Sequence, residues 1–236
     1  MLLIFSSFYD KIVLSLEPLR ESCFSFVGNL TVSRANFANG KIHRLLFVPL
    51  RSGGMEIKMR IDNDFFTLNA LEAAPALVGK LICLKKTDGE VLKMRITETE
   101  AYLGESDTAC HASRGKTDRN SALWLEGGHT YVYLCYGMYN MFNVITGAEG
   151  DPQGVLIRGV EGYLGPGKFT KHCGIDKSYN KIDMRFSDDI WIEDDGVEPD
   201  LVLSPRVGID YADEKDRTAL YRFTDKRFAR EILSKK

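Results

Sequence analysis

The stretch Val91-Leu92-Lys93-Met94-Arg95-Ile96-Thr97-Glu98-Thr99-Glu100-Ala101-Tyr102 predicts a long β-strand that ends in carboxylates. Side chains of a strand alternate between two faces. One face should hold Leu92, Met94, Ile96, Glu98, Glu100 and Tyr102, and the other, predicted to be solvated, Val91, Lys93, Arg95, Thr97 and Thr99. A carboxylate on a buried face is costly unless it is paired or hydrogen-bonded. Glu98 and Glu100 are therefore either salt-bridged glutamates at a strand end or part of a functional site.

The segments around this strand predict a mixed α and β domain. Helical spacing runs from Leu68 to Val78, with Gly79 as its cap; Pro75 must kink this helix or lie near its start. The turn Thr87-Asp88-Gly89-Glu90 predicts a hairpin. Further strands are expected at residues 81–86, 131–136, 143–146, 155–160, 189–193, 205–210 and 220–223. Because the connections are too short for regular crossover helices, the fold should be α+β with a largely antiparallel sheet.

The chain changes character near residue 54. Residues 1–54 show no sustained helix or strand periodicity, and Ser52-Gly53-Gly54 is followed by Met55. One interpretation is that Met55 is the true start and residues 1–54 are an upstream extension. The other is a poorly ordered N-terminal tail. In both, residues 55–236 are expected to form one domain.

Composition favours a soluble globular protein in the cytoplasm. Hydrophobic residues make up 44% of the 236 residues and charged residues 27%. No apolar run approaches the roughly 20 residues of a membrane-spanning helix, and the N-terminus lacks the pattern of a secretory signal. The five cysteines form no C-x-x-C pair, so neither a disulfide framework nor a zinc site is indicated. We expect no metal, no cofactor, no membrane partner and a monomer.

Charge is unevenly distributed along the chain. Residues 183–200 hold eight acids and one base, within a net charge of −2 for the whole chain. Such a segment is either a solvated loop and sheet edge or, in a protein that binds phosphates, a surface that faces away from them. The loop from Arg114 through Lys116 to Arg119 is basic and could hold phosphates or simply be solvated. Lys168 ends the glycine-flanked turn Gly165-Pro166-Gly167, which could approach a ligand closely.

Two further patterns bear on function. Four of the ten tyrosines cluster at Tyr131, Tyr133, Tyr136 and Tyr139. Such a cluster can be core, a stacking surface for nucleobases, or, at a bend such as Gly137, a wedge into a duplex. Arg158 lies within the apolar run 155–160 and needs a partner, for which Glu100 would be suitable.

Together these segments resemble the alkyladenine, or 3-methyladenine, DNA glycosylase family. The resemblance runs from about Phe65 to Phe228, and its pieces occur in the family's order. They are Glu98-Thr99-Glu100-Ala101-Tyr102-Leu103-Gly104, Ala109-Cys110-His111, Thr130-Tyr131-Val132-Tyr133, Tyr136-Gly137-Met138-Tyr139, Val155-Leu156-Ile157-Arg158, Gly165-Pro166-Gly167-Lys168 and Pro205-Arg206-Val207-Gly208. Each piece alone is weak, whereas the combination is specific.

The resemblance implies a compact domain with a β-hairpin that enters the minor groove of double-stranded DNA, and a role for each matching residue. Glu100 matches the general base, and Arg158 the arginine that helps hold the attacking water. Tyr102, His111 and Tyr133 match the residues that sandwich a flipped purine. Asn143 matches the residue whose bulk disfavours guanine, and Tyr136 the wedge. Arg114, Lys116, Arg119 and Lys168 are candidates for contacts with the DNA backbone.

Two departures and three alternatives remain at this stage. The connection between Arg158 and Gly165 is shorter than in vertebrate members of the family, and residues 1–54 match nothing in the family core. The alternatives are a damage-binding protein without catalysis, a metal-dependent nuclease that uses Glu98 and Glu100, and an RNA-binding module that uses the tyrosines.

Overall fold

The computed structural model describes residues 2–5, 12–15, 37–38, 41–42 and 60–233. The chain divides into two units, Met1–Lys58 and Met59–Lys236. In the first unit, β1 (Leu2–Phe5) pairs with β2 (Ile12–Ser15), and β3 (Phe37–Ala38) pairs with β4 (Lys41–Ile42). The seam expected between Ser52 and Met55 lies outside the described residues.

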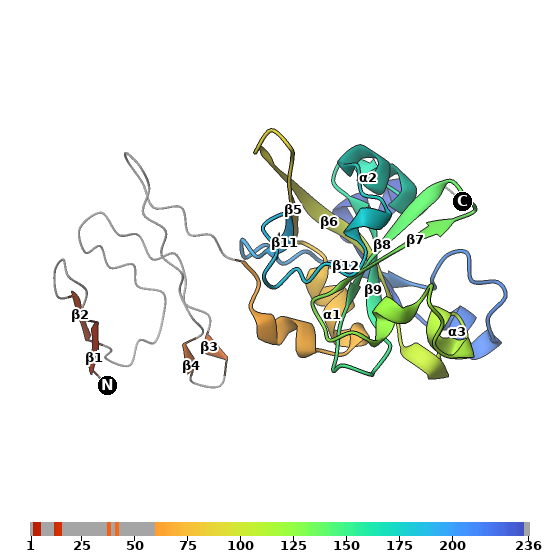
Figure 1. Ribbon diagram of the computed structural model, residues 1–236, viewed down its shortest axis with the longest axis horizontal. Coiled ribbons are helices and arrows are strands. Elements are labelled where there is room, and N and C mark those ends of the chain that lie inside the picture. The colour runs from red at the N-terminus through yellow and green to blue at the C-terminus, as the bar shows by residue number, and fades with distance from the viewer. Residues whose placement is uncertain (1, 6–11, 16–36, 39–40, 43–59, 234–236) are drawn as a thin grey trace. The chain divides into compact units, whose positions relative to one another are not determined.

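The second unit contains most of the strands that the sequence led us to expect, together with several helices (Figure 1). Its strands are β5 (Leu81–Lys85), β6 (Val91–Tyr102), β7 (Thr130–Cys135), β8 (Tyr139–Ile145), β9 (Gly154–Val160), β10 (Tyr163–Leu164), β11 (Ile190–Glu193), β12 (Leu201–Ser204) and β13 (Arg222–Asp225). Its α-helices are α1 (Ala70–Leu77), α2 (Pro166–Cys173), α3 (Glu214–Thr218) and α4 (Lys226–Leu233). Its short 3-10 helices are η1 (Asn63–Thr67), η2 (Gly104–Ser106), η3 (His111–Arg114), η4 (Ser121–Trp124) and η5 (Lys177–Tyr179).

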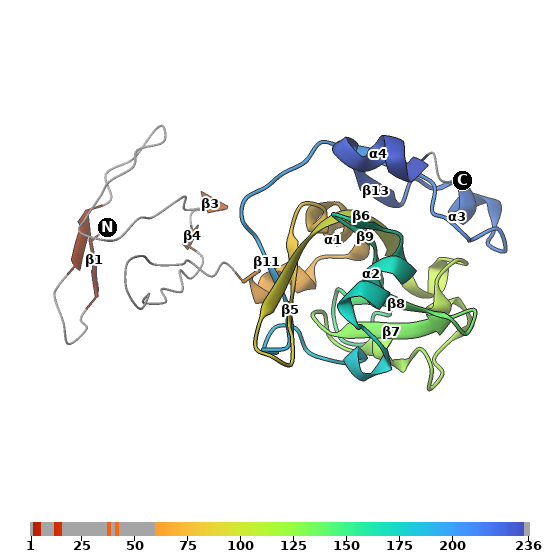
Figure 2. The same cartoon turned by 90° about the horizontal axis from the view of Figure 1, so that it is seen from above.

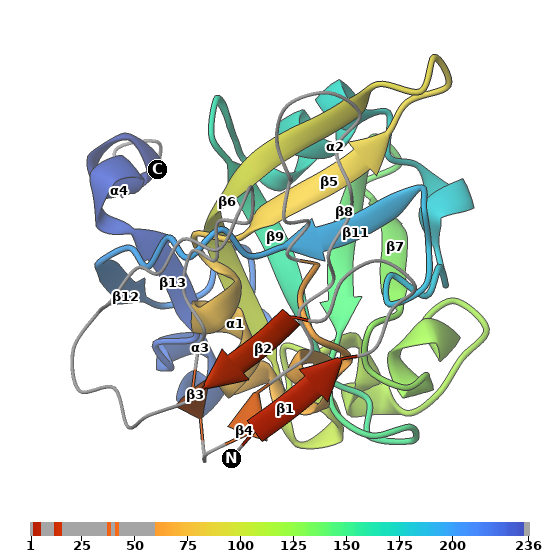
Figure 3. The same ribbon diagram turned by 90° about the vertical axis from the view of Figure 1, so that its left-hand side faces the viewer.

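All strand pairings are antiparallel, which confirms the predicted mixed fold. The main path runs β11-β5-β6-β9-β8-β7, and Figure 3 shows β11, β5, β6 and β9 side by side. The long strand β6 belongs to both halves of the sheet. One of its edges pairs first with β5 and then, from Glu98 to Glu100, with β13, while its other edge pairs with β9. Figure 2 shows β6 and β9 crossing the middle of the unit.

A β-bulge in β6 corrects the predicted faces. The register with β9 shifts by one residue between Ile96 and Glu98 and shifts back before Thr99, and a local irregularity of this kind can turn neighbouring side chains to the other face. Met94 and Ile96 therefore share the main core with Ala101, whereas Glu98 and Glu100 contact groups on the opposite face. Predicting a solvated face for Thr97 and Thr99 was wrong: both are buried, and Thr99 Oγ1 donates to Ala74 O of α1.

Helix ends follow local sequence rules. Asn69 and Glu72 form a capping box at the start of α1. The residue that caps the end of α1 is Val78, whose N–H donates to Pro75 O. Gly79 follows it with a φ of 91°, and its N–H donates to Ile96 O of β6 instead of to the helix. Pro75 lies inside the last turns of α1, not near its start. Among the described residues, no helix combines the length and apolar character needed to cross a membrane.

Two predicted segments differ from the structure. Pro166-Gly167-Lys168 is the first turn of α2 instead of an isolated turn, because proline is favoured at the first helical positions. The strand expected at 205–210 is absent, and β12 (Leu201–Ser204) precedes it. Pro205 lacks a ladder donor, and the backbone N–H of Val207 donates to Glu100 instead of to a neighbouring strand.

Candidate active site

One line of residues crosses five neighbouring strands and forms the base of the site. Arg222 pairs with Glu100, Glu100 with Leu156, Leu156 with Asn143, and Asn143 with Tyr131. Directly paired residues on adjacent strands project to the same face of a sheet. The strand order therefore brings residues from β13, β6, β9, β8 and β7 together.

Glu100 is fully buried and is hydrogen-bonded from two directions. Its Oε1 accepts from the backbone N–H of Val207 at 2.9 Å, and its Oε2 accepts from the hydroxyl of Tyr102 at 2.9 Å. Burial and the Glu100 carboxylate raise the pKa of Tyr102 well above its ordinary value. Tyr102 consequently remains a phenol and keeps its proton as the donor to Glu100.

Arg158 links Glu100 to Glu98. Its Nη1 lies 3.3 Å from Glu100 Oε1, and its Nε donates to Glu98 Oε1 at 3.0 Å. Burial alone would lower the pKa of Arg158, but the two carboxylates outweigh it and raise the pKa. The sequence-based prediction that Arg158 requires Glu100 as a partner is confirmed, and Glu98 is a second partner that it did not identify.

An aromatic wall is formed by His111, Tyr131 and Tyr133. The rings of His111 and Tyr133 meet edge to face with centroids 4.5 Å apart, and the Tyr131 and Tyr133 centroids are 5.1 Å apart. His111 Nδ1 lies 3.0 Å from the Tyr131 hydroxyl. Loss of water around the imidazole, together with the charge of Arg119, lowers the pKa of His111. The ring is therefore neutral at neutral pH.

Arg206 supports Tyr102 from behind. Its guanidinium lies 4.7 Å from the centroid of the Tyr102 ring and makes two parallel hydrogen bonds to Asp107, of 2.5 and 2.8 Å. A third hydrogen bond of 2.8 Å goes to the carbonyl of Ala101. Such bidentate pairs fix geometry as well as charge, so the position of Tyr102 is set by a buried ion pair.

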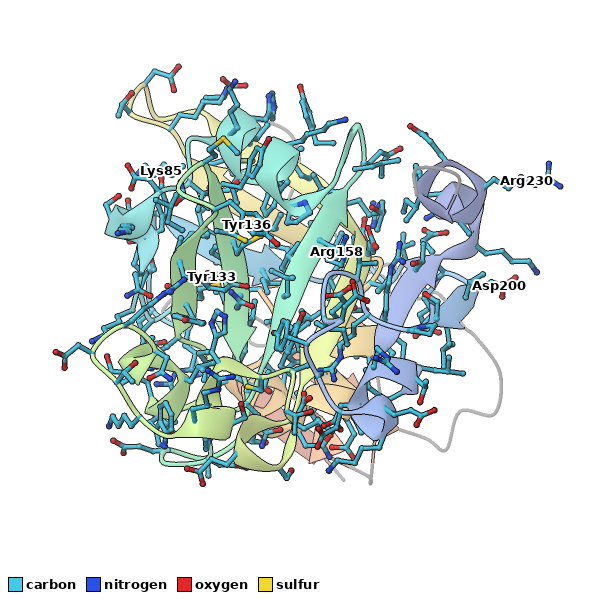
Figure 4. All side chains as sticks on the ribbon, turned by 90° about the vertical axis from the view of Figure 1, so that its right-hand side faces the viewer. Lys85, Tyr133, Tyr136, Arg158, Asp200 and Arg230 are labelled. Carbon is cyan, nitrogen blue, oxygen red and sulfur yellow. The ribbon has the colours of Figure 1, made fainter. Side chains whose placement is uncertain are left out.

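A cavity of about 480 Å³ brings most of the predicted residues together. It is lined by residues from β6 to β9, from η3 and from the segment after β12, including Tyr102, His111, Arg119, Tyr133, Tyr136, Asn143 and Arg158. Figure 4 labels Tyr133 on β7, Tyr136 at the turn between β7 and β8, and Arg158 on β9. Glu100 does not itself line the cavity: it is buried behind the lining residues Tyr102, Arg158 and Val207, which contact it. Arg114, Lys116 and Lys168 also do not line the cavity and lie exposed on η3, the following loop and α2.

The hairpin of β7 and β8 carries an exposed tyrosine at its turn. Tyr136 has a φ of 50° and Gly137 a φ of 70°, which is the pattern of a type I′ turn. Positive φ is uncommon for a bulky residue. Tyr136 is nevertheless 86% exposed, so its side chain projects beyond the rim of the cavity with no packing to compensate.

The acidic segment has partners of its own elsewhere on the unit. Glu193 pairs with Lys93 at 2.6 Å, Asp195 with Arg95 at 2.7 Å and Asp194 with Lys80 at 2.9 Å. Its strand β11 is at the end of the main sheet path, next to β5. The predicted solvated loop fits Asp195, which is exposed, whereas Glu193 on β11 is buried.

Comparison with known proteins agrees with this geometry. A family model described as methylpurine-DNA glycosylase matches residues 64–164 and 163–228. The chain belongs to the methylpurine-DNA glycosylase family. A protein of Borreliella burgdorferi, provisionally named a 3-methyladenine DNA glycosylase, is 41% identical over 176 residues, which cover 69% of this chain and 94% of that protein. A protein of Methanocella arvoryzae with the same provisional name is 39% identical over 186 residues, or 70% and 92% of the two chains.

Membership of the methylpurine-DNA glycosylase family indicates DNA as the substrate and agrees with the motifs that first suggested it. Sequence reasoning missed several residues that support the candidate site. Asp107, Asn120 and Arg222 are buried; Asn120, for example, donates to the backbone carbonyls of His111 and Gly115. Arg206 lay within a matching segment, but only its contacts with Asp107 and Tyr102 reveal what it does.

Proposed function

We propose that this protein is a monofunctional DNA glycosylase that flips alkylated or deaminated purines out of duplex DNA and hydrolyses their N-glycosidic bonds. One observation carries this proposal: Glu100, an acid with no exposed surface, lies beside an aromatic cavity and is held by Arg158, Tyr102 and Val207. Buried carboxylates with specific charged partners in a cleft are candidates for catalysis. The family match supports DNA as the substrate.

In this proposal the damaged base stacks between Tyr102 on one side and the His111–Tyr133 pair on the other. Stacking on aromatic side chains contributes about 1–3 kcal/mol per base. Extruding a base costs a few kcal/mol, and less when the base is damaged or mispaired. The two contributions are of similar size, so the pocket can select bases that are already weakly held in the duplex.

The chemical step then requires a base for water. A carboxylate offers about four acceptor positions, and three neighbouring donors surround Glu100, which leaves one position for water. Glu100 takes a proton from that water, whose oxygen bonds to C1′ of the sugar. The bond between C1′ and the purine nitrogen breaks, and its electron pair leaves with the purine. A cationic alkylated purine departs as a neutral base, so little help from an acid is needed, and no amine nucleophile is involved.

Two further residues are given roles in recognition. Asn143, whose Nδ2 donates to the carbonyl of Tyr131 at 2.9 Å, would present a fixed amide that excludes the exocyclic amine of guanine. Tyr136 would enter the minor groove and fill the space that the base leaves. Tyr136→Ala should slow base release from well-paired lesions about 10-fold, the equivalent of one lost stacking contact. Single-turnover rates on paired and mismatched hypoxanthine would test this, since a mismatch needs the wedge less.

The DNA backbone is proposed to contact the basic groups outside the cavity. These are Arg114, Lys116 and Arg119 on one side and Lys168 on α2. The acidic residues that pair with Lys93 and Arg95 would remain outside the interface. We further propose that residues 55–236 suffice for activity as a monomer, with residues 1–54 as an extension.

The test is release of free base by the full chain from duplexes that carry 3-methyladenine, 7-methylguanine or hypoxanthine. We expect free purine and an intact strand that breaks only on alkaline treatment. Binding to these duplexes without any release would instead indicate a damage-binding protein of the same fold. Release that stops in a chelator would indicate a metal-dependent enzyme.

A further inference from the structure

The proposed base Glu100 is the end of a row of four charges of alternating sign, of which three are buried and Arg158 is 15% exposed. Arg222 Nε lies 2.5 Å from Glu98 Oε1, Arg158 Nε lies 3.0 Å from the same oxygen, and Arg158 Nη1 lies 3.3 Å from Glu100 Oε1. The side chains of Glu98 and Arg222 are 2% and 8% exposed. The row comes from three strands, β13, β6 and β9, and sums to zero charge.

We propose that Glu98 and Arg222 are positioning residues for the proposed glycosylase reaction: they divide Arg158 between two carboxylates so that Glu100 stays available as a base. This inference rests on the proposed function. Arg158 has five N–H donors in a planar fork and would make a bidentate pair with an isolated carboxylate. Because Nε is engaged by Glu98, only Nη1 reaches Glu100, and that contact is long.

The geometry around Glu98 supports this role. Glu98 pairs with Gly159, not with Arg158, because the register of β6 and β9 is irregular there. A side chain at Gly159 would meet Thr97 Oγ1 at 3.2 Å and Glu98 Oε2 at 3.5 Å. A Cβ at this position would be tight only against Thr97 and in ordinary contact with the carboxylate. The irregular register is accompanied by contacts from Arg158 to both glutamates.

Charged and titratable groups on several elements lie around Glu100. They are Glu98 and Tyr102 on β6, Arg158 on β9, Arg222 on β13, Tyr133 on β7, and Arg206 and Tyr211 in the segment that follows β12. Glu98 and Arg222 have opposite charges and act on Arg158 in opposite directions. Their removal should therefore have opposite effects on the pH at which Glu100 takes up its proton.

The experiment measures single-turnover base release against pH on a 7-methylguanine duplex. This base is already cationic, so the acid limb of the profile reports on the protein. In Glu98→Gln, Arg158 is free to pair fully with Glu100. We expect the rate to fall about 10- to 100-fold, as for a misplaced catalytic group, and the acid limb to move about one pH unit lower. In Arg222→Gln, Glu98 has lost its other partner and should draw Arg158 away from Glu100. The acid limb of the pH–rate profile should therefore move to higher pH.

The double variant Glu98→Gln/Arg222→Gln separates positioning from folding. It buries no unpaired charge, so its melting temperature should exceed that of Glu98→Gln, yet its rate should stay low because Arg158 remains undivided. Asp195→Asn, which breaks an ion pair at the other end of β6, is the matched control and should leave both rate and profile unchanged.

Several results would overturn the inference. One is a base-release rate for Glu98→Gln within twofold of that of the original chain. Another is a shift of the acid limb of the pH–rate profile in the same direction in both single variants. The third is a double variant whose base-release rate recovers together with its stability. If Glu98→Gln does not fold, two other measurements still test the positioning role. They are the position of the acid limb in the pH–rate profile of Arg222→Gln and the base-release rate of the double variant. Absence of base release by the original chain would refute the proposed function itself. Base release by the original chain whose rate and pH profile do not change in Glu98→Gln would refute only the positioning role.

Discussion

The two halves of β6 use the same residue types in opposite surroundings. Before the bulge, Lys93 and Arg95 pair with Glu193 and Asp195. The Asp195 and Lys93 side chains are 38% and 36% exposed, whereas Glu193 is itself buried. After the bulge, Glu98 and Glu100 are 2% and 0% exposed and share Arg158. One strand thus carries solvent-side ion pairs at one end and a buried charge row at the other.

The difference teaches which charges to associate with function. An exposed ion pair contributes about 0–1 kcal/mol, so many arrangements serve equally well. A buried ion pair stabilises the fold little more than a well-packed apolar pair would, although removing one of its partners costs about 3–5 kcal/mol of stability. Charges retained in the buried half are therefore better explained by chemistry than by stability, and four substitutions test this contrast.

The largest effect is expected at the centre of the buried half. Glu100→Gln preserves shape and can still accept from Tyr102, but it cannot take a proton from water. Base release should fall about 100- to 10,000-fold, while binding to a damaged duplex is retained. Single-turnover rates and equilibrium binding on the same duplex check this. Retention of more than a tenth of the rate would contradict the role of general base.

The next effect concerns the support of Tyr102. Arg206→Gln leaves Asp107 buried without its ion-pair partner and should lower the free energy of unfolding by about 3–5 kcal/mol. Urea unfolding measures this. Adding Asp107→Asn should restore part of the loss, because the unpaired charge is gone. A loss in the free energy of unfolding below about 1 kcal/mol for Arg206→Gln would mean that the Arg206–Asp107 pair contributes no more than an exposed ion pair.

A smaller effect is expected on the same line of residues as Glu100, at Asn143. Asn143→Ser should increase release of undamaged guanine relative to hypoxanthine, since leaving a buried polar group unpaired costs about 1–3 kcal/mol. The ratio of the two rates on matched duplexes is the measurement, with 7-methylguanine release as the control for intact chemistry. An unchanged ratio with that control intact would remove Asn143 from selectivity.

The smallest effect belongs to the exposed half. Asp195→Asn should change the free energy of unfolding by less than about 1 kcal/mol and leave base release unaltered. The same urea experiment serves, repeated at high salt, where the difference should shrink further. A cost comparable to that of Arg206→Gln would mean that exposure does not separate the two halves.

Much of the fold could be predicted because the strands carry their own signals. The limits of β6 and the turn after β5 follow from alternation and from Thr87-Asp88-Gly89-Glu90. The prediction failed where contacts from other elements determine burial: Thr97 and Thr99 look solvated in sequence, but both are buried, and Thr99 lies against α1. The helix α2 was missed because glycine and lysine at its start are also typical of a turn.

For the candidate site, the sequence alone determined the residue types: a carboxylate at a strand end, an arginine in an apolar strand, clustered tyrosines and the motifs that indicate the family. It also determined that Arg158 needs an acidic partner, because burial of a lone charge is prohibitive. Only the tertiary structure decided which acids those are and that Arg206, Asp107 and Arg222 stand behind the cavity. The physical reason is that side-chain alternation is a local rule, whereas a one-residue bulge and the strand order β13-β6-β9-β8-β7 join residues more than a hundred positions apart.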